Sequence, residues 1–342
     1  MRNKIFLVAG GTGGHLFPAI ATSENDRKNN YVFLLDERTK KYVENTNKKY
    51  HIITSHKFQK NPIYFPLMIL KIFIGFLQSI YLIINYKPKL IVGFGGYTSI
   101  PTLIAAKLLG KKILIHEQNA VLGRTNRLLS LVAERVALTF KKTKFSDKKA
   151  IHTGIPLRKE KQINNSTQKN IFNILVIGGS QGASIFTKLM PKIIGNINKK
   201  HLGKIMVLQQ TREEDIDELQ NVYKKIGVKF KLKSFFSNIQ TEIKNAKIVF
   251  SRCGSSTLAE IEYHQSFSVL FPLPTAIDNH QYLNALEFKK KNNCIIQNQN
   301  NVDYKKISQV LMKHLFKKNL CKNKLKSTKK ISLNMVINDM LN

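Results

Sequence analysis

Short runs of apolar residues recur along the chain, and a stretch of mixed polarity follows each of them. Apolar runs without alternating polar positions are typical of strands that are buried on both faces of a sheet. The stretches between them are long enough for helices, so the pattern predicts an α/β protein with parallel sheets. The predicted strands are residues 4–9, 32–35, 90–92 and 113–115 in the first half and 174–177, 205–208, 248–250 and 269–271 in the second.

Two of the predicted strands end in glycine-rich turns. Residues 10–15 read GGTGGH, and residues 178–183 read GGSQGA. A glycine turn between a strand and a helix lets the backbone approach a ligand closely, and the helix N-terminus then offers amide groups to an anion. One such unit near the start of each half predicts two Rossmann-like domains.

Residues 63–84 form the most hydrophobic segment, which Pro66, Lys71 and Gly75 interrupt. It falls short of a clean membrane span of about 20 apolar residues, and its spacing predicts a helix over residues 67–86. Two interpretations stay open: a core helix, or a surface patch that dips into an anionic membrane. The second is favoured by flanking lysines, which are Lys57, Lys60, Lys87 and Lys89.

Charge is the most unusual feature of the composition. The 342 residues include 56 Lys and Arg against 21 Asp and Glu, a net charge of +35, which would attract nucleic acid or an anionic membrane. The excess is mainly lysine in a chain rich in Asn and Ile, so an AT-rich genome is an alternative explanation. Three separated cysteines, Cys253, Cys294 and Cys321, argue against a zinc site or a disulfide framework.

The glycine turns differ from the nucleotide motifs of other enzymes. Leu16 stands where a dinucleotide fingerprint has its third glycine, and no Lys-Ser/Thr pair follows either turn. These differences argue against a dehydrogenase. They do not exclude one, because Asp36 follows the second strand, where such enzymes place the acidic residue that binds ribose. A polar stretch over residues 153–167 predicts the boundary between the domains.

Seven motifs cover almost the whole chain in a fixed order: GGTGGH at 10, GFGGYTS at 93, HEQN at 116, GIPLR at 154, GGSQGA at 178, RCGSSTLAE at 252 and NHQYLNA at 279. Together they resemble the MurG family of bacterial N-acetylglucosamine transferases. The arginine motif departs from the usual Gly-Asn-Pro-Val-Arg, because Ile155 and Leu157 replace the Asn and the Val. Arg158 itself is kept.

The resemblance implies a GT-B fold, with two Rossmann-like domains whose parallel sheets face a central cleft. The domains would comprise residues 1–157 and 158–328, and a helix in residues 329–342 could return to the first domain. The implied reaction is inverting transfer of N-acetylglucosamine from UDP-N-acetylglucosamine to the undecaprenyl-linked muramyl-pentapeptide lipid, without a metal or other cofactor. The enzyme would bind the anionic cytoplasmic face of the inner membrane peripherally, with no nucleic acid as a partner.

The resemblance places UDP-N-acetylglucosamine mainly on the second domain. Ser180 and Arg158 would hold its diphosphate. Glu260 would accept the ribose hydroxyls, the backbone of Phe236 would read the uracil, and Gln281 would contact the sugar. The remaining donor contacts would be Ser255, Ser256, Thr257, Leu258 and Ala259 in the second domain and Thr12, Gly13, Gly14 and Asn119 in the first. From position alone, Ser180 could instead be a helix N-cap, and Thr257 with Glu260 a capping box.

The first domain would bind the acceptor. His15 follows the first glycine turn, where its imidazole could take a proton from the attacking hydroxyl or only orient the loop or a diphosphate. Tyr97 and Glu117 are the other catalytic candidates. His116 and Glu117 could be either a scaffold or a second acid–base pair.

Other functions remain possible at this point. Asp215 and Asp217 have the Asp-x-Asp spacing of metal-dependent sugar transferases, although acidic residues also favour the start of a helix. A transferase of the same fold with a soluble or diacylglycerol acceptor is one rival. A nonenzymatic RNA-binding protein is another, but the chain shows no aromatic-basic stacking motif.

Overall fold

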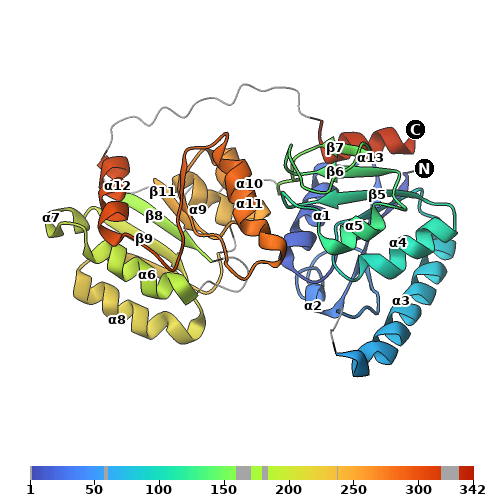
Figure 1. Cartoon of the computed structure of the whole chain (residues 1–342), viewed down its shortest axis with the longest axis horizontal. Coiled ribbons are helices and arrows are strands. Elements are labelled where there is room, and N and C mark those ends of the chain that lie inside the picture. The colour runs from blue at the N-terminus through green and yellow to red at the C-terminus, as the bar shows by residue number, and fades with distance from the viewer. Residues whose placement is uncertain (1, 58–60, 159–170, 179–183, 237, 317–330) are drawn as a thin grey trace. The chain divides into compact units, whose positions relative to one another are not determined.

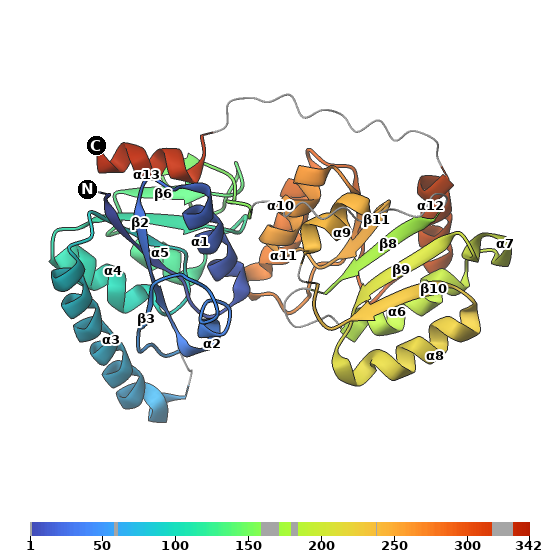
Figure 2. The same cartoon turned by 180° about the vertical axis from the view of Figure 1, so that it is seen from behind.

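The computed structural model describes residues 2–57, 61–158, 171–178, 184–236, 238–316 and 331–342. The chain divides into two compact units: unit 1 is Met1–Lys159 with Ser327–Asn342, and unit 2 is Glu160–Lys326. Each unit has a parallel β-sheet with helices packed around it (Figure 1; Figure 2). The alternation of apolar runs and mixed stretches therefore predicts the fold class correctly.

Unit 1 has a seven-stranded sheet in the order β3-β2-β1-β4-β5-β6-β7. Helices α1 and α13 pack on one face, and α3, α4 and α5 pack on the other, so neighbouring residues of the central strands are buried alike. The strands are β1 Lys4–Val8, β2 Asn30–Leu35, β3 Tyr50–Ile52, β4 Leu90–Gly93, β5 Lys112–Glu117, β6 Arg135–Leu138 and β7 Ala150–His152. The helices are α1 Gly13–Asn25, α2 Glu37–Lys40, η1 Pro62–Tyr64, α3 Phe65–Tyr86, α4 Ser99–Leu108, α5 Arg124–Leu129 and α13 Leu333–Leu341.

Unit 2 has a six-stranded sheet in the order β10-β9-β8-β11-β12-β13. Helices α6, α8 and α12 bury their apolar sides in one continuous core with the strands. The strands are β8 Phe172–Ile177, β9 Ile205–Gln210, β10 Lys229–Lys233, β11 Ile248–Ser251, β12 Phe267–Leu270 and β13 Cys294–Ile296. The helices are α6 Ser184–Gly195, α7 Lys199–Leu202, η2 Glu213–Asp215, α8 Ile216–Ile226, α9 Ile239–Asn245, α10 Ser255–His264, η3 Ile277–Asn279, α11 His280–Lys289 and α12 Tyr304–Phe316.

The apolar pattern fails at the margins of the sheets. It does not predict β3, β7, β10 and β13, which are the edge strands of the two sheets, or β6 beside an edge. Edge strands are short and partly exposed, so lysine and other polar residues are tolerated there; β10, for example, reads Lys-Phe-Lys-Leu-Lys. The pattern also places β12 over residues 269–271, whereas the strand is Phe267–Leu270.

The C-terminal helix α13 completes the core of unit 1. Leu333 and Ile337 lie buried among residues of the sheet and α1. The Lys112 Nζ donates a hydrogen bond of 2.6 Å to the carbonyl oxygen of Met340. Residues from the end of the chain therefore belong to the same compact unit as its first strand.

Helix α3 lies on the surface of unit 1, and its buried strip is narrow: Gly75, Ser79, Leu82 and Ile83. A Cβ atom on Gly75 would come within 2.0 Å of the Thr54 carbonyl oxygen, so glycine permits this close packing. Among the described residues, α3 is also the one helix that is long and apolar enough, by length and composition, to cross a bilayer.

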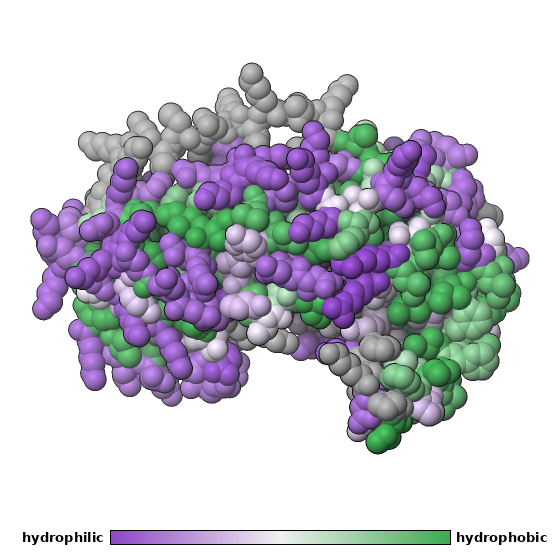
Figure 3. All heavy atoms as spheres, viewed as in Figure 1, coloured by the Kyte–Doolittle hydropathy of each residue, from purple (hydrophilic) through white to green (hydrophobic). Residues whose placement is uncertain are grey.

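The outer face of α3 is apolar. The side chains of Ile69, Phe73 and Leu77 are 63%, 54% and 49% exposed, and Figure 3 shows apolar side chains gathered over this part of unit 1. The core-helix interpretation is therefore wrong for most of α3, because α4 and the loop at Thr54 cover only one strip of it.

Candidate active site

Two glycine loops touch at the carboxyl ends of β1 and β4, which are neighbours in the sheet. A Cβ atom on Gly10 would come within 2.1 Å of Thr98 Oγ1, and one on Gly96 within 2.5 Å of the Gly10 carbonyl oxygen. Side chains at either glycine would push the loops apart. The half-buried Tyr97 follows Gly96 in the second loop. From β1 the chain adds β2 and β3 on one side, and from β4 it adds the later strands on the other side. Open α/β sheets bind ligands at the point between two such strands, where the strand order reverses.

Helix α1 starts at this contact. Gly13 is its first residue and Thr12 its N-cap. The Thr12 side chain makes no capping hydrogen bond among the described residues. Thr12 and Gly14 are exposed. The first turn therefore presents backbone amide groups and the positive end of the helix dipole, which together favour an anion.

His15 lies in the first turn of α1 and is half-buried. Its Nδ1 donates a hydrogen bond of 2.9 Å to the carbonyl oxygen of Gly10. In the neutral ring the lone pair is then on Nε2, which lies beside Gly95, 3.3 Å from where a Cβ atom on that glycine would be. This tautomer is the one that can accept a proton at Nε2.

Asp36, at the end of β2, is committed to the first glycine loop and to α2. Its carboxylate accepts hydrogen bonds from the Gly11 backbone amide at 2.9 Å and from Arg38 Nε at 3.0 Å, and it also accepts from Thr39. These partners fill the position that a dehydrogenase would use for ribose. The carboxylate instead fixes the loop beside α1.

Glu117 is buried at the end of β5 and is a centre of hydrogen bonding. One carboxylate oxygen accepts from the Asn119 amide and side chain at 2.9 and 3.2 Å. The other accepts from the Gly123 amide at 2.9 Å and from Asn126 Nδ2 at 2.8 Å. These donors engage both oxygens of the carboxylate, and the contacts fix the half-buried Asn119 and the loop that leads into α5.

Arg158 belongs to unit 1. The centre of its guanidinium lies 4.6 Å from the centroid of the Phe17 ring. The same ring packs against Gly13, because a Cβ atom there would come within 2.7 Å of it. The cation is therefore placed beside the first turn of α1.

In unit 2, α10 begins after β11 with Gly254 as its N-cap, and a glycine has no side chain that could cap the helix. The capping box of Thr257 with Glu260 is wrong, because the helix starts at Ser255. Glu260 lies in its second turn and is buried. Ser256 Oγ is buried without a hydrogen-bond partner among the described residues. The predicted donor contacts Leu258 and Ala259 follow on the same helix.

Three side chains brace the loops after β11 and β12. Gln281 Oε1 accepts from the backbone amides of Cys253 at 3.1 Å and Leu273 at 3.0 Å, so its amide group is held with Nε2 directed elsewhere. Asn284 Nδ2 donates to the Cys253 carbonyl oxygen at 3.1 Å. Arg252 Nη1 donates to the carbonyl oxygens of residues 271 and 272. Sequence reasoning missed Arg252, although the scarcity of arginine in the chain was a signal.

The other predicted positions are less informative. Phe236 is buried, as a core side chain would be, whereas Phe235 is exposed. Asp215 pairs with Arg212 at 3.1 Å, and the described residues contain no group of three His, Cys, Asp or Glu that could hold a metal. Ser180 lies outside the described residues.

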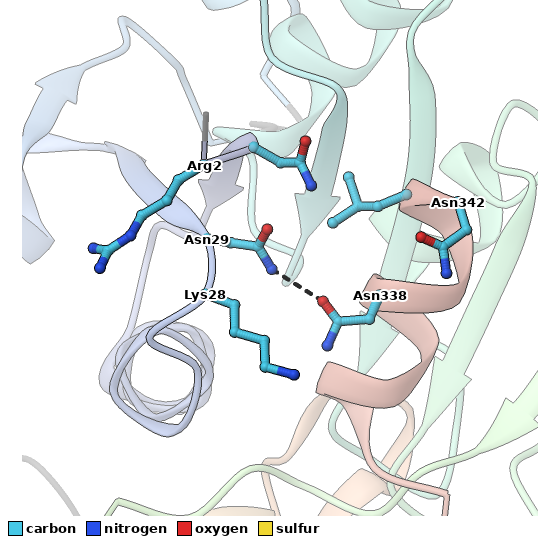
Figure 4. Close-up of a pocket in the computed structure, with 7 residues that line it drawn as sticks. Arg2, Lys28, Asn29, Asn338 and Asn342 are labelled. Atoms are coloured by element: carbon cyan, nitrogen blue, oxygen red, sulfur yellow. Dashed lines mark hydrogen bonds between the residues drawn. The ribbon is translucent and has the colours of Figure 1, made fainter.

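A hollow of about 570 Å³ lies at the other end of the strands of unit 1, where β1 and β2 begin. Arg2 and Lys28 line it at the amino ends of β1 and β2, and Asn29 donates to Asn338 of α13 across it (Figure 4). Ligands of open α/β sheets bind at the carboxyl ends of the strands. The loops around His15, and not this hollow, are therefore the candidate site.

Comparison with known proteins agrees with this architecture. The glycosyltransferase family 28 N-terminal domain matches residues 5–138, and the family 28 C-terminal domain matches residues 173–337. These matches and the two parallel-sheet units confirm the predicted GT-B class.

Relatives of the whole chain are also found. A UDP-N-acetylglucosamine--N-acetylmuramyl-(pentapeptide) pyrophosphoryl-undecaprenol N-acetylglucosamine transferase of Rickettsia canadensis is 38% identical over 309 residues, 86% of each chain. One of Wolbachia sp. subsp. Drosophila simulans is 34% identical over 96% of this chain and 95% of the relative. The crystal structure of Acinetobacter baumannii MurG superposes with a TM-score of 0.73 at 25% identity, over 92% and 90% of the two chains. The chain belongs to the MurG family within glycosyltransferase family 28.

Proposed function

We propose that this hexosyltransferase moves N-acetylglucosamine from UDP-N-acetylglucosamine to the 4-hydroxyl of undecaprenyl-diphospho-N-acetylmuramoyl-pentapeptide, a step of peptidoglycan synthesis. The relatives named above carry this activity in their names. The observation that carries the proposal is the position of the motifs, which gather at the carboxyl ends of parallel strands. They are residues 10–15 after β1, 93–99 at β4, 116–119 at β5, 154–158 after β7 and 252–260 after β11.

The donor binds chiefly to unit 2. The first turn of α10, whose N-cap is a glycine, attracts the nucleotide, and Glu260 accepts the ribose hydroxyls from the second turn. Gln281 donates from Nε2 to a hydroxyl of the sugar, because Oε1 is already used by two backbone amides. The backbone at Phe236 reads the uracil.

The acceptor hydroxyl is activated in unit 1. His15 Nε2 takes the proton as the hydroxyl oxygen attacks the anomeric carbon and the bond from that carbon to the diphosphate breaks. The configuration at the anomeric carbon is thereby inverted. Tyr97 contacts the acceptor from the neighbouring loop. For Glu117 a positioning role is favoured over that of a base, because both carboxylate oxygens already accept hydrogen bonds from the loop that leads into α5.

The leaving diphosphate is stabilised without a metal ion. Arg158 supplies a fixed cation beside α1, and helix N-terminal amides supply further donors. Ser180 is expected to add a hydroxyl, as the sequence motif implies. Asp215 is already engaged by Arg212, which favours its reading as a helix-opening residue.

The enzyme binds the membrane peripherally, at the cytoplasmic face where its lipid acceptor is presented. The exposed apolar face of α3 supports this proposal, as do the exposed lysines Lys57, Lys87 and Lys89 near its ends. Lys60 lies outside the described residues.

One assay tests the function. The protein is incubated with labelled UDP-N-acetylglucosamine and the muramyl-pentapeptide lipid in EDTA, and the disaccharide lipid is expected. Free UDP without labelled lipid would point to another acceptor. Product that forms only with added Mg²⁺ or Mn²⁺ would contradict the metal-free mechanism alone.

A further inference from the structure

The chain leaves unit 1 through residues 153–158, which we call the exit segment. The first two backbone amides of this segment both donate to the carbonyl oxygen of Leu138, at 2.9 and 3.1 Å. Near its other end, Asn25 of α1 donates from Nδ2 to the carbonyl oxygen of Leu157 at 2.8 Å. The exit segment is thus fastened to β6 and to α1 immediately before Arg158.

His116 adds a third attachment from inside the domain. It is fully buried at the end of β5, and its ring lies 5.5 Å from the ring of Phe94. Its Nε2 lies 3.1 Å from the carbonyl oxygen of Gly154, so Nε2 carries the proton and donates. Gln118 Nε2 donates to His116 Nδ1 at 3.1 Å and to the His116 carbonyl oxygen at 2.9 Å.

These contacts leave His116 no role in proton transfer. A single neutral tautomer satisfies both ring nitrogens, and burial lowers the pKa of His116 to about 4. Protonation would also turn Nδ1 from an acceptor into a donor facing the Gln118 amide. The ring is therefore built to hold an orientation.

Gly154 is the point where this orientation reaches the backbone. Its φ is +72°, in the left-handed region that favours glycine. Its carbonyl oxygen accepts from both His116 and Thr153 Oγ1, the latter at 3.0 Å. Four residues later, Arg158 stacks on Phe17 beside the start of α1.

We propose that His116, oriented by Gln118, is a positioning residue that sets Arg158 through the carbonyl oxygen of Gly154. It touches no substrate. The inference rests on the proposed function, in which Arg158 binds the donor diphosphate.

A double-mutant cycle tests the inference. UDP affinity by calorimetry and kcat/KM of transfer are measured for the parent, His116→Leu, Arg158→Ala and the double variant. In the parent, we expect His116→Leu to lower UDP affinity and kcat/KM about tenfold, the loss typical of one hydrogen bond. In the Arg158→Ala protein, the same substitution should lower them less than about twofold. His116→Gln, which can still donate to Gly154, should recover most of the loss.

His51→Leu is the matched control. This histidine of unit 1 also has a ring hydrogen bond, 2.8 Å from Nε2 to the Tyr86 hydroxyl, but it lies on β3. It should leave UDP affinity and kcat/KM unchanged in both backgrounds.

Equal losses from His116→Leu with and without Arg158 would overturn the inference, as would no loss in the parent. Failure of the proposed function looks different, because the parent would then bind UDP but make no disaccharide lipid.

If His116→Leu does not fold, substitutions at Gly154 provide the same test. Among the described residues nothing lies within 4 Å of a Cβ atom there, so Gly154→Val strains only the backbone, whereas Gly154→Asn tolerates a positive φ. The inference requires Gly154→Val to weaken UDP binding in the parent but not in the Arg158→Ala protein, and Gly154→Asn to leave UDP binding close to that of the parent.

Discussion

Two histidines of unit 1, His116 at the end of β5 and His15 after β1, differ in what surrounds their rings. His116 is buried and has both nitrogens engaged by Gly154 and Gln118, whereas His15 is half-buried in the first turn of a helix. The Gly10 carbonyl oxygen fixes the proton of His15 on Nδ1. These surroundings agree with the different tasks that we propose for them, orientation for His116 and proton uptake for His15.

We expect His15→Ala to lower kcat by at least about 10²-fold, the lower limit for a general base. UDP affinity should stay within a few fold, because the nucleotide is proposed to bind chiefly to unit 2. His15→Gln can keep a hydrogen bond but cannot take up a proton, so it should be as poor as Ala. Steady-state kinetics over a pH range decide this. Recovery of activity with Gln would show that His15 only positions the substrate.

Glu260→Ala should weaken UDP binding by about 1.5 to 3 kcal/mol, because bonds to a charged acceptor are lost. With α10 starting at Ser255, the carboxylate has no capping duty there whose loss would unfold the helix. Calorimetry with UDP measures the change. Glu262→Ala, two residues along the same helix, is the control and should bind like the parent. A Glu260→Ala protein that folds and binds UDP normally would remove this residue from the donor site.

At the scale of elements, α3 shows how burial and composition can disagree. Its residues are among the most hydrophobic of the chain, yet only four of them are buried: Gly75, Ser79, Leu82 and Ile83. Phe76 packs partly against the core, whereas Ile69 and Phe73 point outward. An exposed apolar face of this kind marks an interaction surface.

Replacing Ile69 and Phe73 together with Ser should reduce recovery on vesicles that contain anionic lipid, while melting temperature and circular dichroism stay close to those of the parent. Ile277→Ser with Tyr263→Ser is the matched control, since these side chains of unit 2 are both 61% exposed. The control should sediment with vesicles like the parent. Equal losses in both double variants, or no loss in either, would contradict a membrane role for α3.

At the scale of the whole molecule, unit 1 depends on residues from both ends of the chain. Asp26 accepts hydrogen bonds from the Tyr31 hydroxyl and Asn29 Nδ2, each at 2.7 Å. Asn29 also donates to Asn338 of α13 at 3.0 Å. Burial alone would raise the pKa of Asp26, but its donors outweigh burial and lower the pKa below its ordinary value of 3.8.

A lowered pKa in the folded state stabilises the protein above the unfolded pKa, and this contribution is lost as pH falls through the folded value. Asp26→Asn should therefore cost about 1 to 3 kcal/mol of unfolding free energy at neutral pH. The difference from the parent should shrink as pH falls through 3.8 and below. Urea unfolding at several pH values measures it. Exposed Asp147 is the control, and Asp147→Asn should show a small difference at every pH; a pH-independent cost for Asp26→Asn would contradict the linkage.

The sequence determined the first strand–glycine turn–helix unit, the strand before and the helix after the second glycine motif, the central strands and the order of the motifs, because apolar runs and glycine motifs are local properties of the chain. Parallel strands then bring the loops that follow them to the carboxyl-terminal end of a sheet, as at β1 and β4. The first glycine turn marked His15 as a candidate, and the resemblance to the MurG family added Tyr97, Asn119 and Glu260, without any contact being known.

Only the tertiary structure decided what these groups touch. Glu117 accepts hydrogen bonds from donors within the nine residues that follow it. Asp36 accepts from nearby Arg38 and from Gly11 of another loop, and Gln281 accepts from the amides of Cys253 and Leu273 in two separate loops. The exposure of α3 and the return of α13 to unit 1 likewise depend on which surfaces pack together. A residue type states which hydrogen bonds a group can make, but packing decides which of them are already made, and this separates a positioning side chain from a reacting one.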